Sequence, residues 1–101
     1  LGPDAHVCSL FPGHPAALAV KAPAVAVRNS PKPPPERYSL TFEVLQRARR
    51  IMVVAGGAGK ATAVRLGLGA PDAVEAPASC CRGRETTWYL DEAVAASRSI
   101  V

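Results

Sequence analysis

A continuous apolar run at residues 51–55, Ile-Met-Val-Val-Ala, is followed at once by the turn Gly-Gly-Ala-Gly-Lys at 56–60. An apolar run without alternation is typical of a strand that is buried on both faces, as strands of parallel sheets are. Beyond the turn, Ala61, Val64 and Leu68 recur at helical spacing. This order of buried strand, glycine turn and helix predicts an α/β fold with a parallel sheet.

Segments of strand and helix character flank this unit on both sides. We predict a short strand that contains Val25 and Val27 and ends at Asn29, and a helix over 42–50 with Thr41 as its N-cap. Near the end we predict a strand over 86–90, and Asp91 is suited to cap a short last helix.

The number of predicted strands bears on how complete the domain is. A chain of 101 residues is one domain or part of one. About three strands are too few for a parallel sheet that is covered by helices on both faces. We therefore expect residues 1–101 to form part of a single three-layer αβα domain with a mostly parallel sheet, whose N-terminal part is missing.

Composition excludes several classes of protein. No apolar stretch approaches the roughly 20 residues that a membrane span requires. The three cysteines give an odd count without framework spacing, which favours a reducing, cytoplasmic setting. The net charge of +4 comes from scattered basic residues with only 5% aromatics, so we expect no nucleic-acid partner. A small anionic substrate is compatible with this charge.

Neither metal chemistry nor covalent catalysis is indicated. The possible metal ligands are His6, Cys8, His14, Cys80 and Cys81. They lack the spacing of a zinc site, and adjacent cysteines rarely reach one ion together. Ser9 lacks the Gly-x-Ser-x-Gly elbow of serine hydrolases. We expect no metal and no cofactor.

Asp4 and His6 lie two residues apart in the opening turn. Imidazole titrates near neutrality, so His6 is suited to accept a proton from water. The neighbouring Asp4 carboxylate would fix its tautomer and stabilise the cation. The alternative is an exposed loop histidine beside a capping aspartate, because such pairs are common in loops.

Lys60 stands where the glycine turn enters a helix. A cation there opposes the helix dipole, so an anion held by Lys60 and free backbone N–H groups would explain it, and a phosphate fits. The turn lacks the residues of a nucleotide P-loop. A plain glycine connection followed by a surface lysine is the alternative.

Arg37 follows a proline-rich stretch at 30–36 that can be neither helix nor central strand. We interpret the stretch as a rigid extended loop that holds Arg37, which then loses little entropy on binding a phosphate or carboxylate. The alternative for Arg37 is a surface ion pair with Glu36 or Glu43.

Several segments together resemble one enzyme family. Leu-Gly-Pro-Asp-Ala-His at 1–6, running into Ser-Leu-Phe-Pro at 9–12, is similar to the 6-phosphogluconolactonase signature, in which Gly-x-Gly-x-Asp-Gly-His runs into Ser-Leu-Phe-Pro. The Ser-Pro-Lys-Pro-Pro-Pro-Glu-Arg segment at 30–37, Gly-Lys-Ala at 59–61 and Trp-Tyr-Leu-Asp-Glu-Ala at 88–93 follow the family in order and approximate spacing. The resemblance covers the entire chain.

The resemblance implies a sugar-phosphate isomerase/deaminase-like fold and a cofactor-free activity. That activity is hydrolysis of 6-phosphoglucono-δ-lactone to 6-phosphogluconate in the cytoplasmic, oxidative pentose phosphate pathway. It assigns the general base to His6 and an assisting role to Asp4. It also assigns Arg37 and Lys60 to the substrate phosphate, so the same residues are indicated as by their chemistry.

Two departures from the family keep other readings open. Ala5 replaces the family glycine before the histidine, and a positive φ there would strain the turn by about 1 kcal/mol or more. More than half of the family domain lies outside these residues, so we expect the chain by itself to be inactive. The alternatives are a non-catalytic remnant that binds sugar phosphate or a partner chain, and a glucosamine-6-phosphate deaminase-like isomerase.

Overall fold

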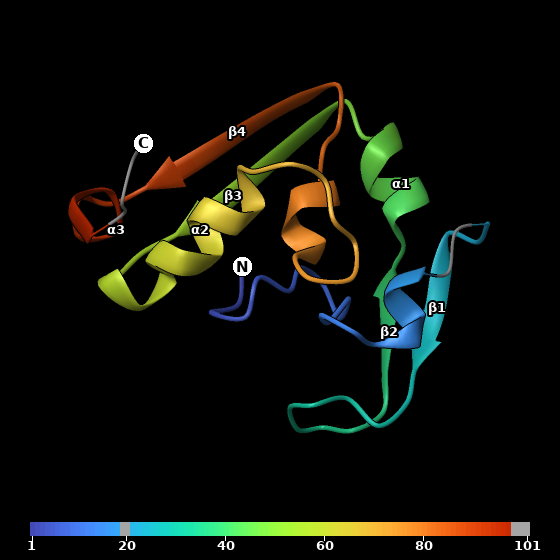
Figure 1. Cartoon of the computed structure of the whole chain (residues 1–101). Helices are drawn as coiled ribbons and strands as arrows, with labels where there is room; N and C mark the ends of the chain where they lie inside the picture. Colours follow the sequence, from blue (N-terminus) through green and yellow to red (C-terminus); the bar gives the residue numbers. More distant parts are fainter. Residues whose placement is uncertain (19–20, 98–101) are drawn as a thin grey trace.

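The computed structural model describes residues 1–18 and 21–97 (Figure 1). The 3-10 helices, labelled η, are η1 (Pro15–Leu18), η2 (Ala58–Lys60) and η3 (Pro77–Cys80). The strands are β1 (Ala24–Val27), β2 (Arg37–Leu40), β3 (Arg50–Ala55) and β4 (Glu85–Leu90). The α-helices are α1 (Phe42–Arg47), α2 (Ala61–Gly67) and α3 (Glu92–Ser97). The predicted α/β class is confirmed.

Strands β3 and β4 form a parallel pair, in register from Arg50 opposite Glu85 to Ala55 opposite Leu90. Figure 1 shows these two long strands side by side, with α2 alongside them and α3 at the end of β4. The βα unit predicted from the apolar run and the glycine turn is therefore present.

Burial of β3 on both faces, in contrast, is wrong for the part of the chain described. Val53 and Ala55 are buried, with Ala55 in a cluster with Val64 of α2 and Val94 of α3. The alternate side chains, Met52 and Val54, are 72% and 67% exposed. The apolar run is continuous, but within the described residues the helices cover only one of its faces.

A second sheet is antiparallel and joins β1 to β2. The predicted strand is β1, although it ends at Val27 instead of Asn29. Strand β2 was not predicted because it is four residues long and begins two residues after the last proline. The loop between them is closed by a 2.9 Å hydrogen bond from the Ser30 amide to the Pro35 carbonyl. Among the residues that the structure describes, the sheets are thus one parallel and one antiparallel pair, so the expectation of a mostly parallel sheet holds only for β3 and β4.

The ends of two helices test the predicted caps. Helix α1 ends at Arg47 instead of residue 50, because Ala48 is already extended (ψ 140°) and β3 begins at Arg50. Thr41 occupies the N-cap position of α1, but its hydroxyl donates to the Ala22 carbonyl and not to the helix. Asp91 does cap α3, since its Oδ1 accepts from the Val94 amide at 2.9 Å.

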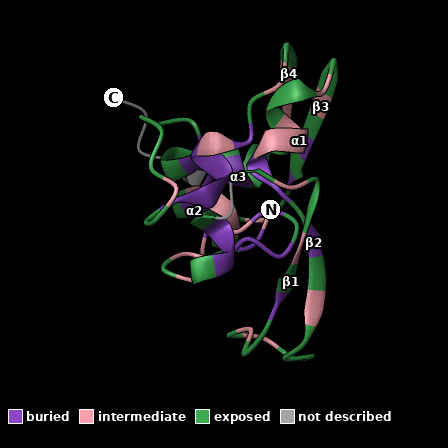
Figure 2. Cartoon of the chain, turned by 90° about the vertical axis from the view of Figure 1, so that its right-hand side faces the viewer, coloured by how far each residue is buried: buried purple, intermediate pink, exposed green. Residues whose placement is uncertain are grey.

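The main core lies beneath the N-terminal segment. Buried side chains from residues 5–17 pack with Phe42 of α1, Ala63 of α2 and Ala78 of η3. Figure 2 shows buried residues gathered around the N-terminal segment and α2, whereas the β1–β2 hairpin is largely exposed. The opening turn is therefore anchored in the core. No helix in the described part of the chain has the length and apolar character to cross a membrane.

Candidate active site

Asp4 and His6 form a close pair in the opening turn. Asp4 Oδ1 lies 2.6 Å from His6 Nδ1 and also accepts the His6 backbone N–H at 3.1 Å. Partial burial by itself would raise the pKa of Asp4, but the two hydrogen bonds and the charges of His6 and Lys32 outweigh it and hold this pKa below its ordinary value. An ionised carboxylate only accepts hydrogen bonds, so neutral His6 carries its proton on Nδ1 and Nε2 offers a lone pair.

The backbone of this turn is shaped closely around the imidazole. The Gly2 amide donates to the His6 carbonyl and the Ala5 amide donates to the Gly2 carbonyl, both at 3.0 Å. A Cβ on Gly2 would lie 2.1 Å from His6 Nδ1, so only glycine fits there. Ala5 has φ 71°, which is the strained conformation expected if the family glycine position requires positive φ.

Phe11 joins the pair to Arg37. Its fully buried ring lies 4.4 Å from the His6 ring, centroid to centroid, at an interplanar angle of 34°. The Arg37 guanidinium carbon lies 5.3 Å from the same centroid, within the range of a cation–π contact. Sequence reasoning did not select Phe11, although its position in the Ser-Leu-Phe-Pro segment after the histidine was a signal.

Arg37 is held by the proline loop that precedes it. Its Nε donates to the Pro34 carbonyl at 3.0 Å, and its Nη2 donates to the carbonyls of Lys32 at 3.0 Å and Pro33 at 2.7 Å. Its Nη1 has a longer contact, 3.5 Å, with the Ser9 hydroxyl. The loop thus fixes the guanidinium as the sequence predicted, and Nη1 is the nitrogen that remains for a ligand. The ion pair proposed as the alternative for Arg37 is not present among the described residues.

The glycine turn is occupied by the protein's own carboxylate. The Gly57 amide donates to Asp91 Oδ2 at 2.9 Å, so the expectation of free N–H groups is wrong at Gly57. Hydrogen bonds from the Val94 and Gly57 amides hold the pKa of Asp91 below its ordinary value. Lys60 Nζ donates to the Leu1 carbonyl, which brings the ammonium to the start of the opening turn.

The four predicted site residues therefore converge on residues 1–11. Asp4 contacts His6 directly, Arg37 approaches it through Phe11, and Lys60 binds the backbone that precedes it. An ammonium has three donors and only one is bound to Leu1, so Lys60 can still bind an anion.

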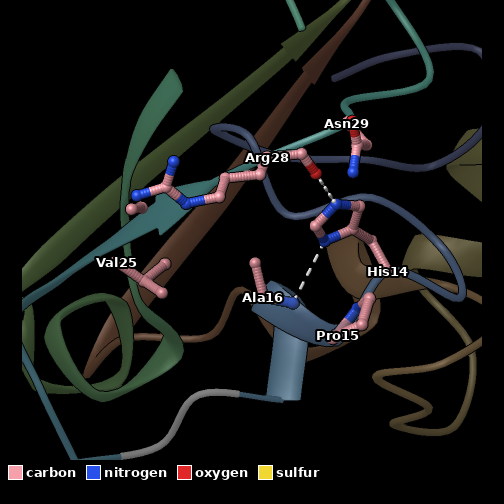
Figure 3. Close-up of a pocket in the computed structure, with 7 residues that line it drawn as sticks. His14, Pro15, Ala16, Val25, Arg28 and Asn29 are labelled. Atoms are coloured by element: carbon pink, nitrogen blue, oxygen red, sulfur yellow. Dashed lines mark hydrogen bonds between the residues drawn. The ribbon is translucent and has the colours of Figure 1, made fainter. Parts of the chain in front are cut away.

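A separate cavity lies beside His14 and contains none of these four residues (Figure 3). Its volume is about 560 Å³, and its lining is His14, Pro15, Ala16, Val25, Ala26, Arg28 and Asn29. His14 Nδ1 accepts from the Ala16 amide at 3.1 Å, so Nε2 carries the proton and donates to the Arg28 carbonyl at 2.6 Å. Because both nitrogens are engaged, His14 is a structural residue. Within residues 1–18 and 21–97, no three His, Cys, Asp or Glu side chains are grouped to hold a metal.

Comparison with known proteins identifies the family. Residues 1–89 match the family described as glucosamine-6-phosphate isomerases/6-phosphogluconolactonase. The chain belongs to this family. Its fold is accordingly similar to that of a 6-phosphogluconolactonase from Trypanosoma brucei, with a TM-score of 0.74 at 32% identity over 95% of this chain and 39% of that one.

Two curated members of the family are similar in sequence. The 6-phosphogluconolactonase of Streptomyces coelicolor is 45% identical over 96 residues, which are 94% of this chain and 37% of that protein. The human 6-phosphogluconolactonase is 40% identical over 97 residues, which are 94% of this chain and 38% of that protein. The chain thus spans about two fifths of the length of the relatives it matches.

Proposed function

We propose that this site hydrolyses 6-phosphoglucono-δ-lactone to 6-phosphogluconate, a step of the cytoplasmic oxidative pentose phosphate pathway, with His6 as the general base. The observation that carries the proposal is the 2.6 Å contact between Asp4 and His6 Nδ1, which leaves Nε2 with a lone pair that can accept a proton. The two curated relatives bear the lactonase name, which favours a lactone over an amino-sugar phosphate as the substrate.

The proposed reaction needs only a water molecule and this pair. His6 Nε2 removes a proton from water while the oxygen attacks the lactone carbonyl. The tetrahedral intermediate then breaks its bond to the ring oxygen, and the imidazolium returns the proton to that leaving oxygen. The Asp4 carboxylate stabilises the imidazolium between the two proton transfers, and no metal or cofactor takes part.

Lys60 and Arg37 are proposed to hold the phosphate of the substrate. Lys60 has donors beyond the one bound to the Leu1 carbonyl, and Arg37 offers Nη1, which faces Ser9. Their contribution is binding and orientation, because the phosphate does not react. The loop carbonyls that bind Arg37 preorganise its charge before substrate arrives.

A chimera tests the proposal in a complete domain. We would replace the matching 96 residues of the Streptomyces coelicolor enzyme with this chain and measure lactone hydrolysis above the spontaneous rate. We expect turnover, and we expect His6→Ala to lower it by at least about a hundredfold, the usual range for loss of a general base. The 101 residues alone should be inactive.

His14→Ala is the matched control, since it removes the other histidine and one that has both nitrogens bound within the protein. It should leave turnover within about threefold. A chimera that keeps normal turnover after His6→Ala would refute the proposed mechanism.

A second candidate function is binding of sugar phosphate without turnover, and the positive φ of Ala5 favours it. Here the chimera would bind 6-phosphogluconate through Lys60 and Arg37 but would not hydrolyse the lactone. Changing Ala5 to the family glycine separates the candidates, because activity that appears only with Ala5→Gly would assign the loss to this residue.

A further inference from the structure

We propose that Phe11 is a positioning residue that fixes the plane of the His6 imidazole and holds the Arg37 guanidinium against its ring. The inference rests on the proposed function, in which His6 is the base. It goes beyond that function because Phe11 has no reacting atom and acts only through its two neighbours.

The geometry around the His6 ring supports this role for Phe11. The hydrogen bond between His6 Nδ1 and Asp4 fixes one atom of the imidazole, but the ring can still tilt about that contact. Gly2 packs so closely against Nδ1 and Cε1 that no Cβ fits between them. The Phe11 ring, at 4.4 Å and 34°, supplies a further contact, so that Nε2 points in one direction.

The charges on both sides of Phe11 also support this role. When His6 takes a proton from water, an imidazolium forms near the permanent cation of Arg37. The Phe11 ring contacts both groups, and an aromatic face attracts a cation. An aliphatic side chain of similar size would fill the space but would lack this attraction. Phe11 is also fully buried within the chain itself, so its position does not depend on a ligand.

Turnover in the chimera provides the first test. Phe11→Leu keeps an apolar side chain but removes the ring, and we expect the turnover number to fall about tenfold with KM changed less than twofold. Phe11→Tyr keeps the ring and should stay within about threefold of the unmodified chimera. Leu10→Ala is the matched control, because Leu10 is an equally buried neighbour without a ring and should affect stability more than turnover.

NMR on the 101-residue chain provides a second test that does not depend on activity. We would measure solvent exchange of the His6 Nδ1 proton, which the contact with Asp4 protects. Phe11→Leu should speed this exchange at least about tenfold, whereas Phe11→Tyr and Leu10→Ala should not. The Nε2 proton of His14, bound to the Arg28 carbonyl, is the internal reference in each spectrum.

The two tests fail in different ways. If Phe11→Leu retains both slow exchange and full turnover, Phe11 is not a positioning residue. If Leu10→Ala speeds exchange as much as Phe11→Leu does, the effect is general packing and the proposal is also overturned. If the chimera never hydrolyses the lactone, the proposed function fails, and the exchange measurement still decides whether Phe11 holds His6.

Discussion

The two turns that carry the candidate residues differ in what fills them. In the opening turn at 2–6, the candidate side chains Asp4 and His6 bind each other, and the imidazole occupies the space left by Gly2. In the glycine turn at 56–60, the Gly57 amide is bound by Asp91, a residue 34 positions away in the sequence. The contacts in the first turn are thus between residues close in sequence, whereas the second turn is bound by a carboxylate that is distant in sequence.

This difference explains which part of the site could be predicted from the sequence. A carboxylate two residues from an imidazole on a tight turn has few ways to avoid contact, so the pairing of Asp4 with His6 followed from local chemistry. Nothing local indicated that Asp91 would bind Gly57, because that contact depends on β3 and β4 pairing in parallel and ending together. Asp91 was predicted only as a helix cap, which it also is.

Adding a methyl group to each turn should show the difference between them most clearly. Gly2→Ala would place Cβ within 2.2 Å of two His6 ring atoms, so we expect a loss of lactone turnover in the chimera about as large as that of His6→Ala, a hundredfold or more. Gly59→Ala is the control, because no atom lies within 4 Å of its added Cβ. Kinetics on both variants would contradict the comparison if their losses were equal.

Lys60 crosses from the glycine turn to the opening turn, and it should affect binding more than chemistry. We expect Lys60→Ala to raise KM for the phosphorylated lactone about tenfold or more, the size of a charge-assisted hydrogen bond. Its bond to the Leu1 carbonyl is lost for every substrate, so an unphosphorylated lactone measures that part alone and should change about twofold. Equal changes in KM for both lactones would argue against a phosphate role for Lys60.

Each turn is bound by a carboxylate with a lowered pKa, Asp4 in the opening turn and Asp91 at the glycine turn, and protonation in acid should weaken both contacts. A group whose pKa is lower in the folded state stabilises the fold above its unfolded value, about 3.9 for aspartate, and this stability is lost as pH falls through the folded value. We expect Asp4→Asn to cost about 1 kcal/mol at neutral pH, allowing for its partial exposure, and progressively less as the pH falls through the lowered pKa of Asp4 in the folded state.

The salt dependence of the free energy of unfolding should distinguish the Asp4 contact from the Asp91 contact. Asp4 binds an imidazole that can carry charge, whereas Asp91 binds only backbone amides. In about 1 M salt, where charges are screened within about 3 Å, the effect of Asp4→Asn should shrink more than that of Asp91→Asn. An equal response to salt would show that the Asp4 contact is not ionic.

The fold shows the same limit of local reasoning as the glycine turn. The order of β3, α2 and β4 follows from periodicity and turn residues, and each of these elements was predicted. The exposure of Met52 and Val54 was not predicted. A continuous apolar run shows that both faces of the strand are suited to burial, but it does not show which elements cover each face. Strand β2 was missed because four residues after a proline run give too short a pattern.

The smallest expected effect concerns Ala5, where strain and burial oppose each other. Its positive φ costs about 1–2 kcal/mol relative to glycine, but its fully buried methyl group contributes about 0.8 kcal/mol, and glycine is more flexible in the unfolded chain. Ala5→Gly should therefore raise the free energy of unfolding by less than about 1 kcal/mol. Ala63→Gly is the matched control, since Ala63 is equally buried but lies in helix α2. This variant should lower the free energy of unfolding by about 1 kcal/mol or more. Denaturant unfolding measures both, and a loss of stability in Ala5→Gly similar to that in Ala63→Gly would show that the opening turn holds Ala5 without strain.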